Sequence, residues 1–205
     1  MKILKIIGII IAIIIAGALI WMMTWPTEAH LERTITVIAP VEKVYSVVND
    51  FGQTKHWSPW MKIDPNAVYT YGDITVGSGA SYSWSSDHSQ VGDGRQEILS
   101  STENEMVKTQ MWFGEGMTGI YTSDFILESE GDGTKVTWTY DGKADNPMEK
   151  MMLSFTESYL GSTYDQGLVD LKTYIEGLPD PEPLMEEEMM ESDSTAVEEM
   201  EETEE

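Results

Sequence analysis

The hydrophobic and polar positions divide the chain into three stretches with different patterns. From Ile6 to Met23, 18 residues run without a charge or a strongly polar side chain, enough for a helix of about 27 Å that nearly spans the core of a bilayer. From Leu31 to Ile175, apolar positions recur with strand and helix periods. After residue 179 no regular apolar face remains, which predicts disorder. The pattern therefore predicts an anchor (1–25), one domain (26–179) and an acidic tail (180–205).

The domain begins with a pattern typical of a strand followed by a short helix. Leu31 to Ala39 alternates with period two, and Arg33 interrupts its apolar face near the start. Pro40 suits the beginning of a helix, and the apolar positions that follow recur at spacings of three or four. We expect an amphipathic helix through Asn49, with a buried face formed by Val41, Val44, Tyr45 and Val48.

A series of strands is predicted between Tyr69 and Asp141. The clearest strand is Ser81–Ser85, where Tyr82 and Trp84 lie on one face and serines on the other. A Gly-containing turn at residues 130–133 predicts a hairpin before the last strand. The meander should be antiparallel, and its further strands are expected near Gly92–Ser100, Met106–Phe113, Gly119–Glu128 and Thr134–Asp141.

A long helical segment closes the domain. Asn146 suits the N-cap, Pro147 the first helical position and Glu149 the third, while Gly177 marks the end. Gly161 lies between two apolar stripes, so we expect the helix to bend or restart there. Both stripes should cover the sheet; the first contains Met148, Met152, Phe155 and Tyr159, and the second contains Tyr164, Leu168, Leu171 and Ile175.

The charges beside the N-terminal apolar run predict how it is oriented. Lys2 and Lys5 precede the run and Glu28 and Glu32 follow it, so the positive-inside rule predicts a single-pass protein of the cell membrane with a cytoplasmic N-terminus and an extracytoplasmic domain. A signal peptide cleaved near residues 16–18 is the alternative. The apolar character continues to Met23, which favours an anchor, and either interpretation exports the domain.

Composition excludes several classes of function. The net charge is −24, and 13 acidic residues with no basic residue lie after residue 179. Such a chain repels phosphate backbones, so we predict no nucleic-acid partner, and membrane attachment must come from the apolar helix. The chain has no cysteine, which excludes a disulfide framework and a thiolate metal site. A protein partner is not specified by these features.

No catalytic or metal-binding motif stands out. His30, His56 and His88 lack the spacing of metal ligands, and no nucleophile elbow is present, so we predict no catalytic residue, metal or cofactor. Arg95 is a candidate ligand-binding charge, because Gly92-Asp93-Gly94 before it would allow a bulge that turns its side chain inward. An outward, solvated Arg95 is the competing interpretation.

The order of elements resembles the SRPBCC superfamily, which includes START lipid-transfer domains, the birch-pollen-allergen group and polyketide cyclase/dehydrase-like proteins. Glu32 to Pro40 is similar to the opening strand of that family, and Asp50-Phe51 with Trp57 to Trp60 is similar to its tryptophan segment. Gly131 to Trp138 resembles its last hairpin. The resemblance covers about residues 31 to 176 and implies an α+β helix-grip fold, a curved antiparallel sheet wrapped around a long C-terminal helix.

The resemblance also implies a hydrophobic cavity between the sheet and the helix, although the family shares no catalytic residues. We therefore predict a membrane-anchored, non-enzymatic binding domain for an apolar small molecule or lipid. A cyclase/dehydrase-like enzyme is one alternative, and a protein-interaction module with a filled cavity is another. The candidate cavity residues are Trp57, Trp60, Tyr82, Trp84, Arg95, Trp112, Trp138, Met148, Met152, Phe155 and Tyr159.

Overall fold

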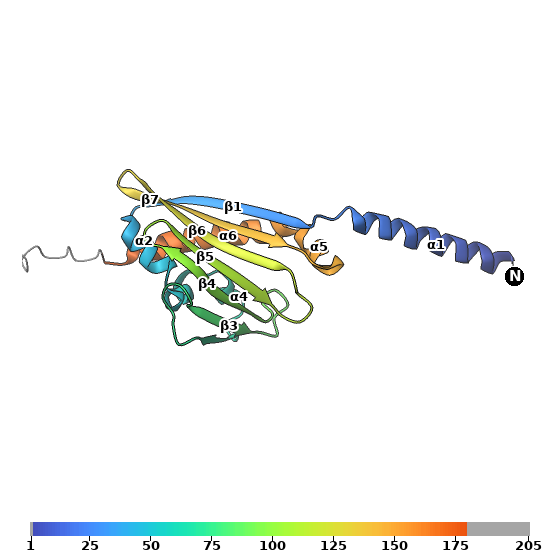
Figure 1. The fold of residues 1–205 in the computed structure, drawn as a ribbon, viewed down its shortest axis with the longest axis horizontal. Coiled ribbons are helices and arrows are strands. Elements are labelled where there is room, and N and C mark those ends of the chain that lie inside the picture. The colour runs from blue at the N-terminus through green and yellow to red at the C-terminus, as the bar shows by residue number, and fades with distance from the viewer. Residues whose placement is uncertain (1, 180–205) are drawn as a thin grey trace, which may run out of the picture.

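A computed structural model describes residues 2–179, and the tail predicted for residues 180–205 lies outside the described residues. One sheet and one long helix form the body of the domain (Figure 1). The elements in chain order are α1 (Lys2–Met23), β1 (Glu28–Val37), α2 (Val41–Val48), a 3-10 turn (Phe51–Gln53), α3 (Thr54–Trp57), α4 (Trp60–Ile63), β2 (Val68–Tyr71), β3 (Ser81–Ser85), β4 (Gly94–Thr102), β5 (Met106–Phe113), β6 (Ile120–Glu130), β7 (Gly133–Lys143), α5 (Pro147–Leu153) and α6 (Thr156–Gly177).

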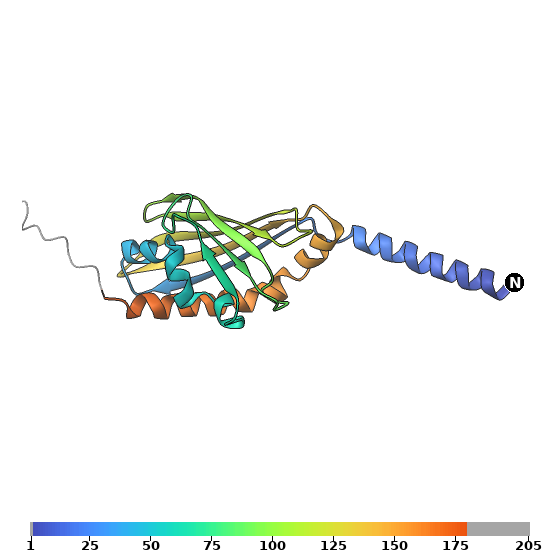
Figure 2. The same ribbon diagram turned by 90° about the horizontal axis from the view of Figure 1, so that it is seen from below.

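The seven strands form one antiparallel sheet in the order β1-β7-β6-β5-β4-β3-β2. The predicted meander is thus confirmed from β2 to β7, and β1 joins its far edge by pairing with β7. The pairing of β4 with β5 shifts register between Ile98 and Ser100, and such an irregularity bends a strand. The curved sheet wraps around α6, which lies along one face (Figure 2). This is the helix-grip fold.

The second apolar stripe of the C-terminal segment forms the contact between α6 and the sheet. Tyr164, Leu168, Leu171 and Ile175 are all almost fully buried. They join one core with inward-facing strand residues such as Ile98, Val107 and Val136. Burial of this stripe is the largest hydrophobic contribution that the helix makes to the fold.

The helical segment breaks earlier than its sequence predicts. α5 ends at Leu153 and α6 begins at Thr156, and Phe155 between them has φ −109° and ψ 7°. Gly161 lies inside continuous α6, so the predicted bend there is wrong. A β-carbon on Gly161 would lie 2.7 Å from the guanidinium of Arg33. A side chain at this position would have to displace the flexible end of Arg33, so the close approach of α6 to β1 favours glycine here without requiring it.

The guanidinium of Arg33, on the edge strand β1, occupies the space beside Gly161. Its guanidinium pairs with Glu157 and lies 3.1 Å from a carboxylate oxygen of Asp165, both on α6. The pairing explains why a charge interrupts the apolar pattern of β1: the residue faces the helix and is neutralised by it.

The predicted start of α5 is confirmed and includes a buried carboxylate. Asn146 and Glu149 form a capping box, and Glu149 is fully buried. Burial alone would raise the pKa of Glu149, but its carboxylate accepts backbone N–H donors from Gly119, Asp145, Thr118 and Asn146, and these lower the pKa below its ordinary value. The carboxylate therefore ties α5 to the loop that precedes β6.

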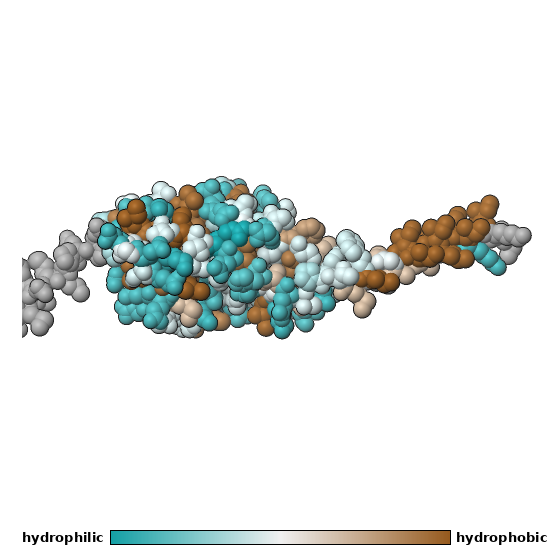
Figure 3. Space-filling model, turned by 90° about the horizontal axis from the view of Figure 1, so that it is seen from above, coloured by the Kyte–Doolittle hydropathy of each residue, from teal (hydrophilic) through white to brown (hydrophobic). Residues whose placement is uncertain are grey.

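The N-terminal helix α1 stands apart from the domain and is hydrophobic on the face that Figure 3 shows. Within residues 2–179 it is the one helix long and apolar enough to cross a membrane, over Lys5–Met23, and a signal sequence would pass the same test. Trp21 and Trp25 meet edge to face at its end, 5.3 Å apart. Thr24 to Thr27 joins it to β1.

Candidate functional site

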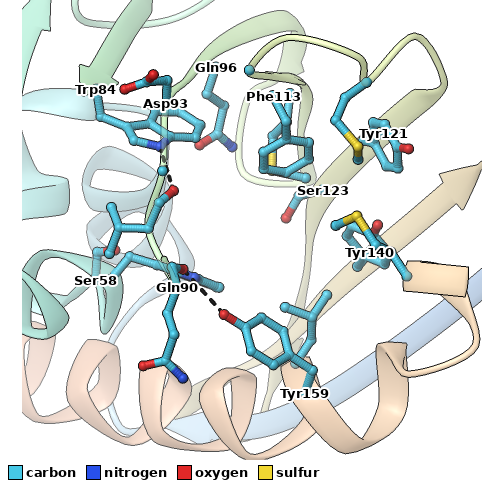
Figure 4. A pocket seen from close by; sticks show the side chains of 18 of the residues that line it. Ser58, Trp84, Gln90, Asp93, Gln96, Phe113, Tyr121, Ser123, Tyr140 and Tyr159 are labelled. Carbon is cyan, nitrogen blue, oxygen red and sulfur yellow. Dashed lines mark hydrogen bonds between the residues drawn. The ribbon is translucent and has the colours of Figure 1, made fainter. Parts of the chain in front are cut away.

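A cavity of about 750 Å³ lies between the concave face of the sheet and the helices α5 and α6. Figure 4 shows side chains from β4, β5, β6 and β7 converging on it from one side and Tyr159 of α6 from the other. Its wall is mainly aromatic and aliphatic. Pockets that bury small-molecule ligands commonly have about 300–1,000 Å³.

The closed end of the cavity is built from stacked aromatic rings. Trp138 of β7 stacks on Tyr164 of α6, with ring centroids 4.1 Å apart. Trp60 meets both rings edge to face, at 5.8 Å and 5.9 Å. Trp57 packs behind this layer, against Trp138 and Phe125, and does not line the cavity. These contacts leave flat apolar surfaces facing the space.

Several polar groups of the wall bond to one another, whereas the buried hydroxyls of Tyr69 and Tyr121 make no hydrogen bond within the described residues. Tyr82 donates to the side-chain oxygen of Gln96 over 2.9 Å, and the amide of Gln96 donates to the hydroxyl of Thr109 over 2.8 Å. The paired groups offer little to a ligand, and the hydroxyls of Tyr69 and Tyr121 offer it isolated polar contacts. The cavity therefore suits a ligand that is mostly apolar.

A second polar cluster joins the sheet to α6. The indole N–H of Trp138 donates to the hydroxyl of Ser123 over 2.8 Å, and the hydroxyls of Ser123 and Tyr164 lie 3.1 Å apart. These groups are buried, so the bonds satisfy their polar atoms and orient the two rings that form the end of the cavity.

The ionisable groups inside the cavity wall are mainly tyrosine hydroxyls. Burial raises the pKa of the hydroxyls of Tyr82, Tyr121, Tyr140 and Tyr164, so they stay protonated near neutral pH. The carboxylates of the lining are Asp93 and Glu115, both in loops at the mouth. Within residues 2–179, no histidine lines the cavity and no cluster of three potential metal ligands occurs.

The mouth of the cavity is bordered by α5, the start of α6 and the loop between β3 and β4. Phe155 and Tyr159 line the cavity and are also 59% and 46% exposed, so they form its rim. The hydroxyl of Tyr159 donates to the carbonyl of Gln90, and the indole N–H of Trp84 donates to the carbonyl of Val91, each over 3.2 Å (Figure 4). The loop is thus held from the helix and from the sheet.

The structure brings most of the sequence-predicted site residues to this cavity. Those that line it are Trp60, Tyr82, Trp84, Trp138, Met152, Phe155 and Tyr159. Those that lie elsewhere are Trp57, Arg95, Trp112 and Met148. Whether any of them contacts a ligand remains a prediction.

Arg95 and Trp112 lie on the outer face of the sheet. Gln96 and Met111 line the cavity, and neighbouring strand residues point to opposite faces. Arg95 pairs with Glu97, and its guanidinium lies 5.2 Å from the ring of Trp112. The bulge expected before Arg95 is absent from the pairing of β4 with β5, whose irregularity comes after Ile98. The prediction that the side chain of Arg95 turns inward is therefore wrong, and the competing outward orientation is the one observed.

Some cavity residues that were not predicted could have been found from the alternation of side chains along the strands. Alternation along β7 puts Tyr140 on the same face as Trp138, and along β5 it puts Phe113 on the same face as Met111. The full sheet register was needed to extend this argument to β6, which contributes Tyr121 and Ser123.

Fold and cavity together define a class of protein, the helix-grip domain that encloses an apolar space. Residues 28–176 match the model of the family described as polyketide cyclase / dehydrase and lipid transport. The match spans most of the chain, and the chain belongs to this family. A comparison with curated proteins found no match.

Solved structures share the fold at low sequence identity. Norcoclaurine synthase from Thalictrum flavum is 13% identical, with a TM-score of 0.57 over 74% of this chain and 96% of that one. A protein from Thermobifida fusca is 17% identical, with a TM-score of 0.56 over 75% and 97% of the two chains. A protein from Chromobacterium violaceum is 20% identical, with a TM-score of 0.50 over 76% and 99%. At these identities the likeness shows the fold alone.

Proposed function

We propose that this chain is a membrane-anchored binding protein that holds an apolar small molecule or a lipid between its sheet and α6. The observation that carries the proposal is the cavity of about 750 Å³, which remains open although aromatic rings pack closely around it. Membership of a family described as including lipid transport supports the same class of ligand.

The chemistry of the wall favours binding over catalysis. A cyclase-like enzyme needs an acid or a base placed against its substrate. The buried hydroxyls of the wall stay protonated, so they can donate a hydrogen bond or a proton but cannot act as bases, and the carboxylates of Asp93 and Glu115 lie at the mouth. A molecule seated inside the cavity would therefore meet rings, methionines and protonated hydroxyls rather than a strong base.

Uptake of an environment-sensitive apolar dye by the full chain in detergent tests the proposal. Leu160 lines the cavity, so Leu160→Trp should fill part of the space and weaken dye binding about tenfold or more. Val169 lies on the same helix, is 50% exposed and does not line the cavity, so Val169→Trp is the matched control. Equal dye binding by both variants and the parent would refute a ligand site in this cavity.

The anchor is tested separately. A reporter fused after Glu205 should be active outside the cytoplasm, and the N-terminal residues should persist in the mature protein. Reporter activity in the cytoplasm would contradict the proposed orientation. A mature chain that begins near Leu19 would identify the apolar run as a cleaved signal peptide instead.

A further inference from the structure

The first apolar stripe of the C-terminal segment is exposed, contrary to the expectation that it covers the sheet. Met148, Met151, Met152 and Phe155 are 48%, 42%, 50% and 59% exposed. Their spacing puts them on one side of α5 and its end, opposite the buried Leu153. Large apolar side chains gathered in this way mark a surface that meets a partner or a membrane. We call these four residues the α5 stripe.

The α5 stripe borders the cavity mouth. Met152 and Phe155 belong to the stripe and also line the cavity. Met148 and Met151 extend it outward and do not line the cavity. Anything that covers the stripe therefore lies directly at the entrance of the cavity.

Chain connections place the α5 stripe at the end of the domain that carries α1. Glu28, the first residue of β1, pairs with Lys143, the last residue of β7, and the N–H of Ala144 donates to the carbonyl of Thr27 over 2.8 Å. α5 starts shortly after, at Pro147. Figures 1 and 2 show α5 beside the junction of α1 and β1.

The connection between α1 and this end is short. Thr24 to Thr27 separates the last residue of α1 from the first residue of β1. Even fully extended, four residues span about 14 Å. If α1 crosses a bilayer, the start of β1 is held close to its surface, whatever angle α1 adopts.

We infer that the α5 stripe rests in the outer surface of the bilayer that α1 spans, so that the cavity opens toward lipid and exchanges its ligand with the membrane. The inference rests on the proposed function. It deepens that function by naming the source of the ligand as the bilayer rather than the surrounding water.

The charges around the α5 stripe indicate what kind of contact this is. Lys143 and Lys150 lie near it, but so do Asp145 and Glu157, and the chain as a whole is strongly acidic. A mixed rim gives no net attraction to anionic headgroups. The contact is therefore apolar, and vesicles of zwitterionic phosphatidylcholine are sufficient to test it.

The absence of cysteine from the sequence allows a single labelled site to report on this contact. Met151→Cys, carrying an environment-sensitive fluorophore in the full chain, is reconstituted into phosphatidylcholine vesicles with or without spin-labelled lipid. Side chains of interfacial helices lie at the boundary of headgroups and acyl chains, so the spin label should lower emission at least about twofold. Ile38→Cys is the control, because Ile38 is 71% exposed and follows β1 at its other end.

Equal, weak quenching at both sites would overturn the inference, as would crosslinking of Met151→Cys to a second copy of the chain in place of lipid quenching. Both results would leave the proposed function standing, because binding of dye added in detergent is measured separately. If the parent chain binds no dye in detergent, the proposed function is refuted, regardless of the result of the quenching experiment.

A kinetic test uses the double variant Met148→Glu with Met151→Glu. Neither residue lines the cavity, so binding of dye in detergent should be unchanged. Transfer of a fluorescent lipid from vesicles into the cavity should slow by about tenfold or more, since each charge would have to leave water when the stripe docks. Ile38→Glu is the matched control. Unchanged transfer in the double variant would contradict the inference.

Discussion

The two halves of the C-terminal helical segment have the same apolar spacing and opposite exposure. Leu171 and Ile175 in the second half are fully buried against the sheet, whereas Met152 and Phe155 in the first half are at least half exposed. Periodicity predicts that a helix has an apolar face. Periodicity does not say what that face contacts. For the first half of the segment, the neighbouring cavity and α1 supply this information.

The largest effect is expected in the buried half. Leu171→Ala should lower the free energy of unfolding by about 3–4 kcal/mol, because a fully buried leucine leaves a cavity in a packed core. Urea unfolding of the full chain in detergent measures this loss. Val169→Ala, at an exposed position on the same helix, should change stability by less than about 0.5 kcal/mol. Similar losses in both variants would contradict the assigned faces.

The next largest loss of stability is expected at Glu149, whose carboxylate holds α5 against the loop before β6. Glu149→Gln should lower the free energy of unfolding by about 2 kcal/mol, because the NH2 group of an amide cannot accept, so two of the four backbone N–H groups that converge on this fully buried side chain would lose their acceptor. Glu103→Gln, at an exposed position in the turn between β4 and β5, is the control. A neutral Glu149→Gln would mean that α5 is not held by this carboxylate.

The loss at Glu149 should depend on pH in a defined direction. The folded-state pKa is lowered from the ordinary 4.5, so the carboxylate contributes its stability above about pH 4.5 and loses it as the pH falls through the folded-state pKa. The difference between the parent and Glu149→Gln should be constant near neutral pH and shrink in acid. Measuring both chains by urea unfolding along a pH series checks this.

A smaller effect on stability, with a distinct effect on binding, is expected at the rim. Phe155→Ala should lower the free energy of unfolding by less than about 1 kcal/mol, because the ring is 59% exposed. The same change should weaken binding of an apolar dye roughly tenfold if the ring covers the ligand. Calorimetry and dye titration on one preparation separate the two. A large loss of stability with unchanged affinity would make Phe155 an ordinary core residue.

The smallest effect on stability is expected from removal of the acidic tail, residues 180–205. Deleting residues 180–205 should leave the melting temperature within about 1 °C of the parent, because the sequence there has no regular apolar face to bury. Thermal unfolding of both chains in the same detergent checks this. A drop of several degrees would mean that the tail docks on the domain.

Much of the fold was predictable because its signals are local. The alternation of Tyr82 and Trp84 with serines identified β3, and Asn146 with Glu149 identified the start of α5. The break before Thr156 was not predictable, since no glycine or proline marks it and the glycine in this part of the segment is Gly161. Gly161 instead lies inside α6 beside Arg33, which is distant in sequence and adjacent in space. The orientation of Arg95 likewise depends on the register of β4, in which Gln96 faces the cavity and Arg95 therefore faces outward.

Native mass spectrometry of the full chain, extracted in mild detergent, shows directly whether the cavity holds a ligand. The parent chain should carry one apolar molecule, which organic extraction then identifies. Leu160→Trp, with part of the cavity filled, should carry much less of it than Val169→Trp. A parent chain that carries no apolar molecule and takes up none when lipid is supplied would rule out a ligand site in this cavity, as would equal occupancy of both variants.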